Sequence, residues 1–285
     1  MSPTTIPGNL ILSNTQLDAR DTDANAYMAA VEAADGEPLE LGVRLAITDF
    51  VVGCKADGIW NAIKASCILA GARTTNGALV PLKGTAPTAV NFDLVNDTDY
   101  DRKLGLTGNA STKYLDSNFN ALSVDLDDIH VSAFVIPTST NGVVLGDREL
   151  AGNTSIRPFR SGLLQNQYYA FANRNLTSTS TANIGPNYNA MFAGSSRSSS
   201  SEFTRRADGT DTTALINSES LANAQSFLIF CGRRNTGGTP QRHTDATIPF
   251  YSLGQALPGS PTQSGLELLD TRVSTLISDL GAAIP

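Results

Sequence analysis

Apolar residues recur at helical spacing near the start of the chain. Over residues 23–36, Tyr27, Met28 and Val31 share one helical face, and Asp23 suits the N-cap position. The segment is rich in alanine and ends in a glycine, as many helices do. The pattern therefore predicts a first, short helix.

Two further helices, over residues 39–57 and 59–70, are predicted to meet at Gly58. Their apolar stripes consist of Leu41, Leu45, Phe50, Val51 and Cys54 in the former, and of Trp60, Ile63, Cys67 and Ile68 in the latter. Helices of this length are marginal alone in water. We therefore expect a three-helix unit that packs on another part of the molecule.

The pattern changes to short apolar alternations after Asn76, separated by Gly, Asn, Asp, Ser and Pro. Asp208 and Gly209 separate two such runs and suit the type I′ turn of a hairpin. Short strands with regular turns are typical of an antiparallel sandwich or jelly roll. The predicted strands span residues 112–116, 129–136, 142–147, 154–159, 167–173, 188–194, 200–207, 210–216, 226–233 and 246–252.

An amphipathic helix is predicted near the C-terminal end, with Ser260 as its N-cap and Pro261 in its first turn. An apolar face of this size must be covered, either by the rest of the chain or by another chain. The apolar positions at helical spacing are Leu266, Leu269, Val273, Leu276, Ile277 and Leu280.

The fold class expected from these patterns is mainly β: an antiparallel β-sandwich with a small N-terminal helical unit and a C-terminal amphipathic helix. We expect the last helix to pack on the helical unit. The chain then divides into an extended N-terminal arm (1–22), the helical unit (23–72), the sandwich (73–256) and the C-terminal helix (257–285).

Composition and charge narrow the class of partner. Charged residues make up 16% of the chain, against roughly 25% in an average soluble protein, and Ser, Thr, Asn and Gly replace them, as in many β-rich extracellular or virion proteins. The net charge of −7 argues against nucleic acid as a partner. The pairs Arg205-Arg206 and Arg233-Arg234 lie in strand-like segments, and we interpret them as solvated strand ends.

The cysteines do not suggest a disulfide framework, and the N-terminus does not resemble an export signal. Cys54, Cys67 and Cys231 are expected to be buried free thiols, although a Cys54–Cys67 disulfide stays an alternative. The first residues lack the basic and long apolar regions of a Sec signal, and no stretch has the roughly 18 apolar residues of a membrane span. We therefore expect a protein made in a cytoplasm and not inserted in a membrane.

The sequence favours a protein that is not an enzyme and needs no cofactor. The paired carboxylates E-x-D-x-E of concanavalin-like glucanases are missing from the sequence, and so is the G-x-S-x-G elbow of hydrolases. His130 and His243 lie far apart in the chain. The acidic residues 125–130 could bind calcium, but they lack EF-hand spacing, and we favour a solvated acidic turn.

The chain resembles phage and prophage virion proteins that carry a helical preface and a LamG-like, concanavalin A-like jelly roll. Residues 104–120, 231–238 and 249–281 are similar to strands and the terminal helix of that family. The most specific part of the resemblance consists of Ala46-Ile47-Thr48-Asp49-Phe50-Val51-Val52, Lys55, Gly58-Ile59-Trp60 and Ile63-Lys64-Ala65.

The resemblance implies a bacteriophage virion structural protein on the particle surface, of tail-fibre or adhesin type, with a lectin-like sandwich for host contact. A capsid decoration (head fibre) protein is the alternative, which the short arm before the helices favours. A glycan-cleaving enzyme and a cellular lectin-like module are further alternatives. The expected partners are other virion proteins, copies of the chain itself, as a trimer, and a host-surface glycan.

Two sets of residues are candidates for these contacts. Jelly rolls often bind sugars through aromatic, Asn and charged side chains at one rim, and apolar helix positions suit assembly. The glycan candidates are Tyr168, Tyr169, Asn173, Arg174 and Tyr188, and the assembly candidates are Trp60, Ile63, Leu269, Val273 and Leu276.

Overall fold

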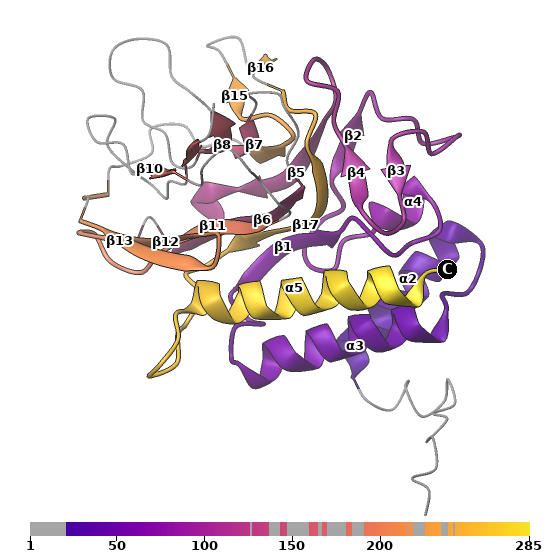
Figure 1. Cartoon of the computed structure of the whole chain (residues 1–285), viewed down its shortest axis with the longest axis horizontal. Helices are drawn as coiled ribbons and strands as arrows, with labels where there is room; N and C mark the ends of the chain where they lie inside the picture. Colours follow the sequence, from indigo (N-terminus) through magenta and orange to yellow (C-terminus); the bar gives the residue numbers. More distant parts are fainter. Residues whose placement is uncertain are drawn as a thin grey trace, which may run out of the picture.

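Two antiparallel β-sheets and a layer of helices make up the fold in the computed structural model (Figure 1). The expected fold class, a mainly β sandwich with an N-terminal helical unit and a C-terminal helix, is confirmed. Among the described helices, none combines the length and apolar character of a membrane span. The structure describes residues 21–125, 127–136, 143–146, 160–164, 167–169, 181–183, 191–215, 217–218, 226–234, 239–241 and 243–285.

The larger sheet has the strand order β13-β12-β11-β6-β17-β4-β3, with β1 also paired to β17. Its strands are β1 (Ile63–Ile68), β3 (Tyr100–Asp101), β4 (Gly105–Thr107), β6 (Ile129–Ile136), β11 (Met191–Arg197), β12 (Phe203–Ala207), β13 (Thr210–Ala214) and β17 (Thr247–Gly254).

The second sheet has the order β10-β9-β8-β7-β14-β5-β2. Its strands are β2 (Thr88–Val90), β5 (Tyr114–Asn120), β7 (Val143–Gly146), β8 (Arg160–Leu164), β9 (Gln167–Tyr169), β10 (Thr181–Asn183) and β14 (Ser226–Ile229). A separate short pair is formed by β15 (Arg233–Arg234) and β16 (Pro240–Gln241), and η1 (Ala121–Ser123) is a 3₁₀ turn.

The helical layer covers one face of the larger sheet. It contains α2 (Thr22–Asp35), α3 (Leu41–Ala56) and α5 (Gly265–Ala283), and a single turn, α4 (Thr75–Ala78), follows β1. Figure 1 shows α3 and α5 side by side, and α5 contacts β11 and β12. Phe50 of α3 packs edge-on against Phe250 of β17, with ring centroids 5.6 Å apart. The apolar face of α5 is therefore covered within the chain.

A row of small side chains crosses the sheet face under the helices. Ser66 of β1 lies opposite Ser252 of β17, Ser252 opposite Ser132 of β6, and Ser132 opposite Gly194 of β11. A Cβ added to Gly194 would lie 3.2 Å from Leu266 of α5 and 2.7 Å from the Ser132 Cβ. The small residues therefore allow α5 to approach the sheet closely.

The predicted helix over residues 59–70 is wrong, because this segment contains β1. Five of the six β1 residues are buried, and Cys67 and Ile68 pair with Tyr251 and Phe250 of β17. A strand buried on both faces has a nearly continuous apolar sequence without alternation. Such a run is not distinguished from a short helix by its periodicity.

The N-cap of α2 is Asp21 and not Asp23. The Asp21 Oδ1 accepts hydrogen bonds from the backbone N–H groups of Asp23 (2.9 Å) and Ala24 (3.1 Å). Asp23 instead lies in the first turn, where its negative charge is favourable to the helix dipole. The acidic sequence before the helix thus caps it, as expected, but two residues earlier.

The C-terminal helix begins later than predicted. Ser264 is its N-cap, and its Oγ accepts a hydrogen bond from the Glu267 N–H at 3.1 Å. Ser260 makes a similar bond with the Gln263 N–H (3.0 Å), but in a turn that does not continue as a helix. A local Ser turn has the same sequence signature as a cap.

The predicted hairpin at residues 208–209 is confirmed. β12 and β13 are antiparallel, with Ala207 opposite Thr210, and Asp208 and Gly209 have φ values of 49° and 69°. Positive φ at both central residues is the mark of a type I′ turn.

Most predicted strands that fall on described residues overlap observed ones. The prediction for 129–136 coincides with β6. The predictions for 112–116 and 188–194 overlap β5 and β11, but each begins and ends a few residues earlier than the strand. The predicted strand 154–159 lies outside the described residues. The strands without a prediction include β1, β2, β3, β4, β8, β10 and β16.

The interpretation of Arg205 and Arg206 as a solvated strand end is wrong. Arg206 is 8% exposed and bridges β13 and α5, with Nη1 2.9 Å from Asp211 and Nε 2.7 Å from Asp270. Arg205 is 9% exposed. The Arg206 guanidinium is buried because α5 packs over this face of β12. Arg233-Arg234 form β15, and their side chains lie outside the described part.

Candidate functional site

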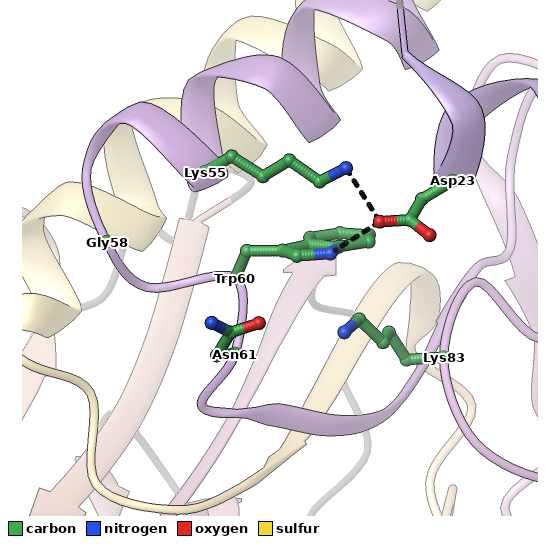
Figure 2. Close-up of a pocket in the computed structure, with 6 residues that line it drawn as sticks. All are labelled: Asp23, Lys55, Gly58, Trp60, Asn61 and Lys83. Carbon is green, nitrogen blue, oxygen red and sulfur yellow. Dashed lines mark hydrogen bonds and ion pairs between the residues drawn. The ribbon is translucent and has the colours of Figure 1, made fainter.

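A cavity of about 320 Å³ opens beside Trp60 (Figure 2). It lies where the end of α3, the turn before β1 and the start of α2 meet. Charged and amide groups surround one aromatic ring there. The lining residues are Asp23, Lys55, Gly58, Trp60, Asn61 and Lys83.

Gly58 lets the chain turn from α3 into β1. It has a φ of 76°, in the left-handed region that strains residues with a Cβ. The N–H groups of Ile59 and Trp60 then both donate to the Cys54 carbonyl, at 3.0 and 3.1 Å. Ile59 is fully buried and anchors the turn. The sequence Gly-Ile-Trp thus places the indole at the cavity wall.

The indole of Trp60 is held on several sides. Its Nε1 donates a hydrogen bond to the Asp23 Oδ2 at 3.0 Å. The Lys83 ammonium lies 4.4 Å from the ring centroid, and the Lys55 ammonium lies 5.6 Å from it. These distances fit cation–π contacts. Trp60 is only 5% exposed, so its ring face is not open for a sugar to stack on.

Lys55 is neutralised by two carboxylates. Its Nζ lies 2.7 Å from the Asp21 Oδ2 and 2.6 Å from the Asp23 Oδ2. Burial opposes the charge on Lys55, but the hydrogen bonds to the two carboxylates outweigh it and raise the pKa of Lys55. The hydrogen bond from Lys55 lowers the pKa of Asp23. The three groups are therefore ionised at neutral pH and tie α2 to α3.

Lys83 carries a charge without such neutralisation. Within the described part of the chain, no carboxylate forms an ion pair with its ammonium, whose contact is the Trp60 ring. Burial lowers the pKa of Lys83, and repulsion by Lys64 and Lys55 adds to this effect, while Asp23 opposes it. The cavity therefore has a positive charge on one wall.

A second cavity, of about 330 Å³, lies next to the first. The two share Asp23, Trp60 and Lys83. The rest of the lining of the second cavity is mainly apolar and comes from α2 and from the segment after α4. It consists of Ala26, Tyr27, Ala30, Val80, Pro81 and Leu82. An anionic group and a neighbouring apolar group could thus be bound together.

The buried thiols and His130 are in surroundings that suit packing. All three cysteines are free, so the Cys54–Cys67 disulfide does not form. Burial raises the pKa values of Cys54 and Cys67 to about 12. Burial lowers the pKa of His130 to about 4, and its Nε2 lies 2.8 Å from the Ser252 Oγ. The histidine is therefore neutral at pH 7.

Asp128, from the acidic stretch before β6, stabilises a neighbouring segment. The Asp128 Oδ1 accepts a hydrogen bond from the Ala256 N–H, and its Oδ2 accepts one from the Gln255 amide, both at 2.7 Å. In the described ranges, no group of three or more His, Cys, Asp or Glu side chains is placed to hold a metal ion.

The predicted glycan candidates lie mostly beyond what the structure describes. Tyr168 and Tyr169 belong to β9, where they pair with Leu163 and Gly162 of β8, and only their backbone is described. The other three candidates, Asn173, Arg174 and Tyr188, lie outside the described residues. The glycan site therefore stays a prediction.

The assembly candidates lie inside the single chain. Trp60 and Ile63 are 5% and 1% exposed, and the α5 residues Leu269, Val273 and Leu276 are at most 1% exposed. Their burial follows from the packing of α5 on α3 and on the larger sheet. These side chains pack in the core of the single chain, and their part in assembly stays a prediction.

Three of the cavity residues, Asp23, Asn61 and Lys83, were not expected from the sequence to act together. Lys83 reaches the indole because a single β-bridge joins it to Ser66 of β1. This contact depends on the position of β1, and no local spacing signals it. The other three, Lys55, Gly58 and Trp60, belong to the motif that the sequence singled out.

No protein-family model and no curated protein matches the chain. Among solved structures, Trypanosoma rangeli sialidase in complex with sialic acid aligns with a TM-score of 0.49 and 12% identity, over 75% of this chain and 33% of the sialidase. The botulinum neurotoxin serotype D binding domain aligns with a TM-score of 0.49 and 9% identity, over 76% of this chain and 52% of that one. The chain thus spans a third to about half of these proteins. Similarity this low carries no argument about activity or ligand.

Proposed function

We propose that the chain is a structural protein of a bacteriophage particle, exposed on its surface as a fibre or adhesin-type protein. The observation that carries the proposal is the segment 46–65, whose pattern resembles phage virion proteins and which forms the joint between α3 and β1. There Gly58 turns the chain, Ile59 enters the core and Trp60 is held by Asp23. The resemblance thus falls on residues with a defined structural task.

The charges around Trp60 support a structural or binding role over a catalytic one. An acid–base catalyst works best with a pKa near the working pH. Here the ion pairs hold the pKa of Lys55 above and that of Asp23 below their usual values. The groups are fixed in their charged forms and connect two helices.

In the proposed arrangement, the helical layer anchors the protein to the particle and the sandwich faces the host. We expect an oligomer, with a trimer favoured, so that several sandwiches act together. Multivalent display can raise binding by a factor of about 10² to 10⁴ without new contacts. A weak single-site affinity for a host glycan is compatible with this role.

The particle role can be tested on phage particles released by the strain that encodes the chain. The particles are purified on a density gradient, and the chain is quantified by mass spectrometry against the major capsid protein. We expect a fixed ratio across independent preparations. A chain that stays in the soluble cell fraction contradicts the proposal. Antibody labelling of intact particles then separates a tail fibre from a capsid decoration protein.

Host contact needs a separate test. The purified chain is coupled to beads at high density and mixed with host cells, or with cells stripped of surface polysaccharide. We expect binding to the former and not to the latter. Beads that bind neither contradict host contact and leave the particle test unaffected. Reducing sugar is measured in the same samples, and its release contradicts a non-catalytic role.

A further inference from the structure

We infer that the cavity at Lys83 docks an acidic side chain of a partner protein, while an aliphatic neighbour of that side chain occupies the adjacent apolar cavity. The inference deepens the proposed function and rests on it for the partner, which is a neighbouring protein of the particle. The binding chemistry itself follows from the residues around Trp60.

The two lysines beside the indole differ in their ion-pair partners. Lys55 lies between the carboxylates of Asp21 and Asp23, at 2.7 and 2.6 Å. Lys83 has no ion-pair partner in the described ranges, and its ammonium is held by the Trp60 ring at 4.4 Å. An ammonium has three N–H donors, and the ring occupies one side of it. Lys83 can therefore accept an external carboxylate.

Asn61 lies near Lys83 at the same cavity. Figure 2 shows its amide on the same side of the indole as Lys83, with Lys55 on the other side. Asn61 is exposed, and its side chain lines the same cavity. A carboxylate offers two oxygens, one for the Lys83 ammonium and one for the Asn61 amide N–H. Among the described residues of the cavity wall, the one carboxylate is that of Asp23, which is paired with Lys55 at 2.6 Å and leaves the charge of Lys83 for an anion. The nearby Lys64 adds to the positive potential.

The apolar cavity shares Lys83 with the first cavity. Its walls include Ala26, Ala30, Val80 and Leu82, and its size of about 330 Å³ suits an aliphatic side chain. A protein segment with an acidic residue beside a leucine or valine fits both cavities. Apolar burial would add affinity to a charge contact that is partly exposed to solvent.

A protein segment fits this site better than an acidic polysaccharide. Sugars are commonly bound against an open aromatic face, and the face of Trp60 is covered, with 5% of the residue exposed. The apolar cavity would also meet the hydroxyl groups of a sugar without offering them partners. The observations therefore favour a peptide.

The probe for the test is the fluorescently labelled peptide acetyl-Ala-Leu-Asp-Leu-Ala-amide, and its twin has Asn in place of Asp. Fluorescence anisotropy measures the affinity of each peptide for the original full-length chain and for its Lys83→Gln variant. Both changes remove the charge-assisted hydrogen bond, so we expect at least a roughly ten-fold weaker binding for the Asn peptide and for Lys83→Gln. The matched control is Lys64→Gln, which removes the same charge from a neighbouring exposed position. It should change binding less than about three-fold because the Lys64 charge is screened.

Lys83→Gln also removes a contact with Trp60, so thermal unfolding checks that it folds. A second variant, Asn61→Asp, leaves that contact intact and offers Lys83 an internal carboxylate. It should lower the affinity for the Asp peptide to that for the Asn peptide. The inference is overturned if both peptides bind equally or not at all, or if the two lysine variants lose the same affinity. It is also overturned if trigalacturonate binds and the peptide does not. None of these results affects the mass-spectrometric test of the particle role.

Discussion

Arg272 of α5 forms a two-pronged pair with Asp57, the C-cap residue of α3. Its Nε lies 2.7 Å from the Asp57 Oδ2 and its Nη2 2.9 Å from the Oδ1. The guanidinium passes over Gly53, where an added Cβ would lie 2.7 Å from the Arg272 Nε and 2.8 Å from its Cζ. The lack of a side chain at Gly53 therefore allows the pair that joins the two helices.

Gly53→Ala should bring no net stability although alanine is the better helix former. We expect the free energy of unfolding to change by less than about 0.5 kcal/mol, because the new Cβ displaces Arg272 from a partly exposed ion pair and this loss offsets the helix-propensity gain. In an Arg272→Ala background the same change should stabilise by up to about 1 kcal/mol, the helix-propensity gain. Urea unfolding of the single and double variants measures the coupling.

The control for this cycle is Gly281→Ala in α5. A Cβ there meets no heavy atom within 4 Å, so it should stabilise by about 0.5–1 kcal/mol in both backgrounds. An equal effect of Gly53→Ala with and without Arg272 contradicts the steric explanation.

Lys55→Met should make the acid limb of the stability curve shallower. The Lys55 hydrogen bond lowers the pKa of Asp23 below its usual 3.8. A lowered carboxylate pKa contributes stability that is present above the unfolded pKa and is lost as the pH falls through the folded one. Without Lys55, less stability remains to be lost below about pH 4. Urea unfolding across this pH range measures the slope.

Lys64→Met is the matched control, since Lys64 is exposed and its ammonium donates to the Asn61 carbonyl. It should leave the pH dependence parallel to that of the original chain. Parallel curves for both variants would show that the ion pairs at Lys55 do not produce the acid limb.

Ser264→Ala should cost about 1 kcal/mol of stability, as the loss of an N-cap typically does. The Ser264 Oγ accepts the Glu267 N–H and donates to the Asp211 carboxylate, so it connects α5 with β13. Ser260→Ala removes only bonds within an exposed turn and should cost less than about 0.5 kcal/mol. Thermal unfolding measures the unfolding temperatures of the two variants. An equal decrease in both would contradict the assignment of Ser264 as the N-cap.

Cys54 and Cys67 should be unreactive toward a thiol reagent at pH 8 in the folded chain. Burial raises both pKa values to about 12, and the thiolate is the reactive form. Labelling with 5,5′-dithiobis(2-nitrobenzoate), followed with and without denaturant, measures this protection. Fast labelling under native conditions would mean that α3 and β1 separate from the core.

The sequence predicts elements whose pattern is local. α2 and α3 each bury one face, so their apolar spacing is helical, and the turn at Asp208 and Gly209 needs two residues that tolerate positive φ. β1 escaped prediction because its neighbours cover both faces and remove the alternation. The start of α5 was misplaced because Ser260 forms a cap-like turn of its own.

The site was only partly predictable for the same physical reason. Trp60 and Lys55 lie within one motif, and the contact between them is local. Asp23 and Lys83 reach the indole from elements that are distant in sequence, through the cap of α2 and the bridge to Ser66. A charge next to an aromatic ring has no sequence signature until the topology brings the two together.

The pairing of β1 with β17 has a consequence for biogenesis. The Tyr251 hydroxyl bonds with Cys67 across 184 positions of the chain, so the larger sheet closes only after β17 has left the ribosome. Until then the apolar faces of α3 and β1 lack their partners, and contacts of such long range form slowly. A nascent chain is therefore exposed to aggregation until β17 has emerged, and we expect its yield to depend on chaperones that bind α3 and β1.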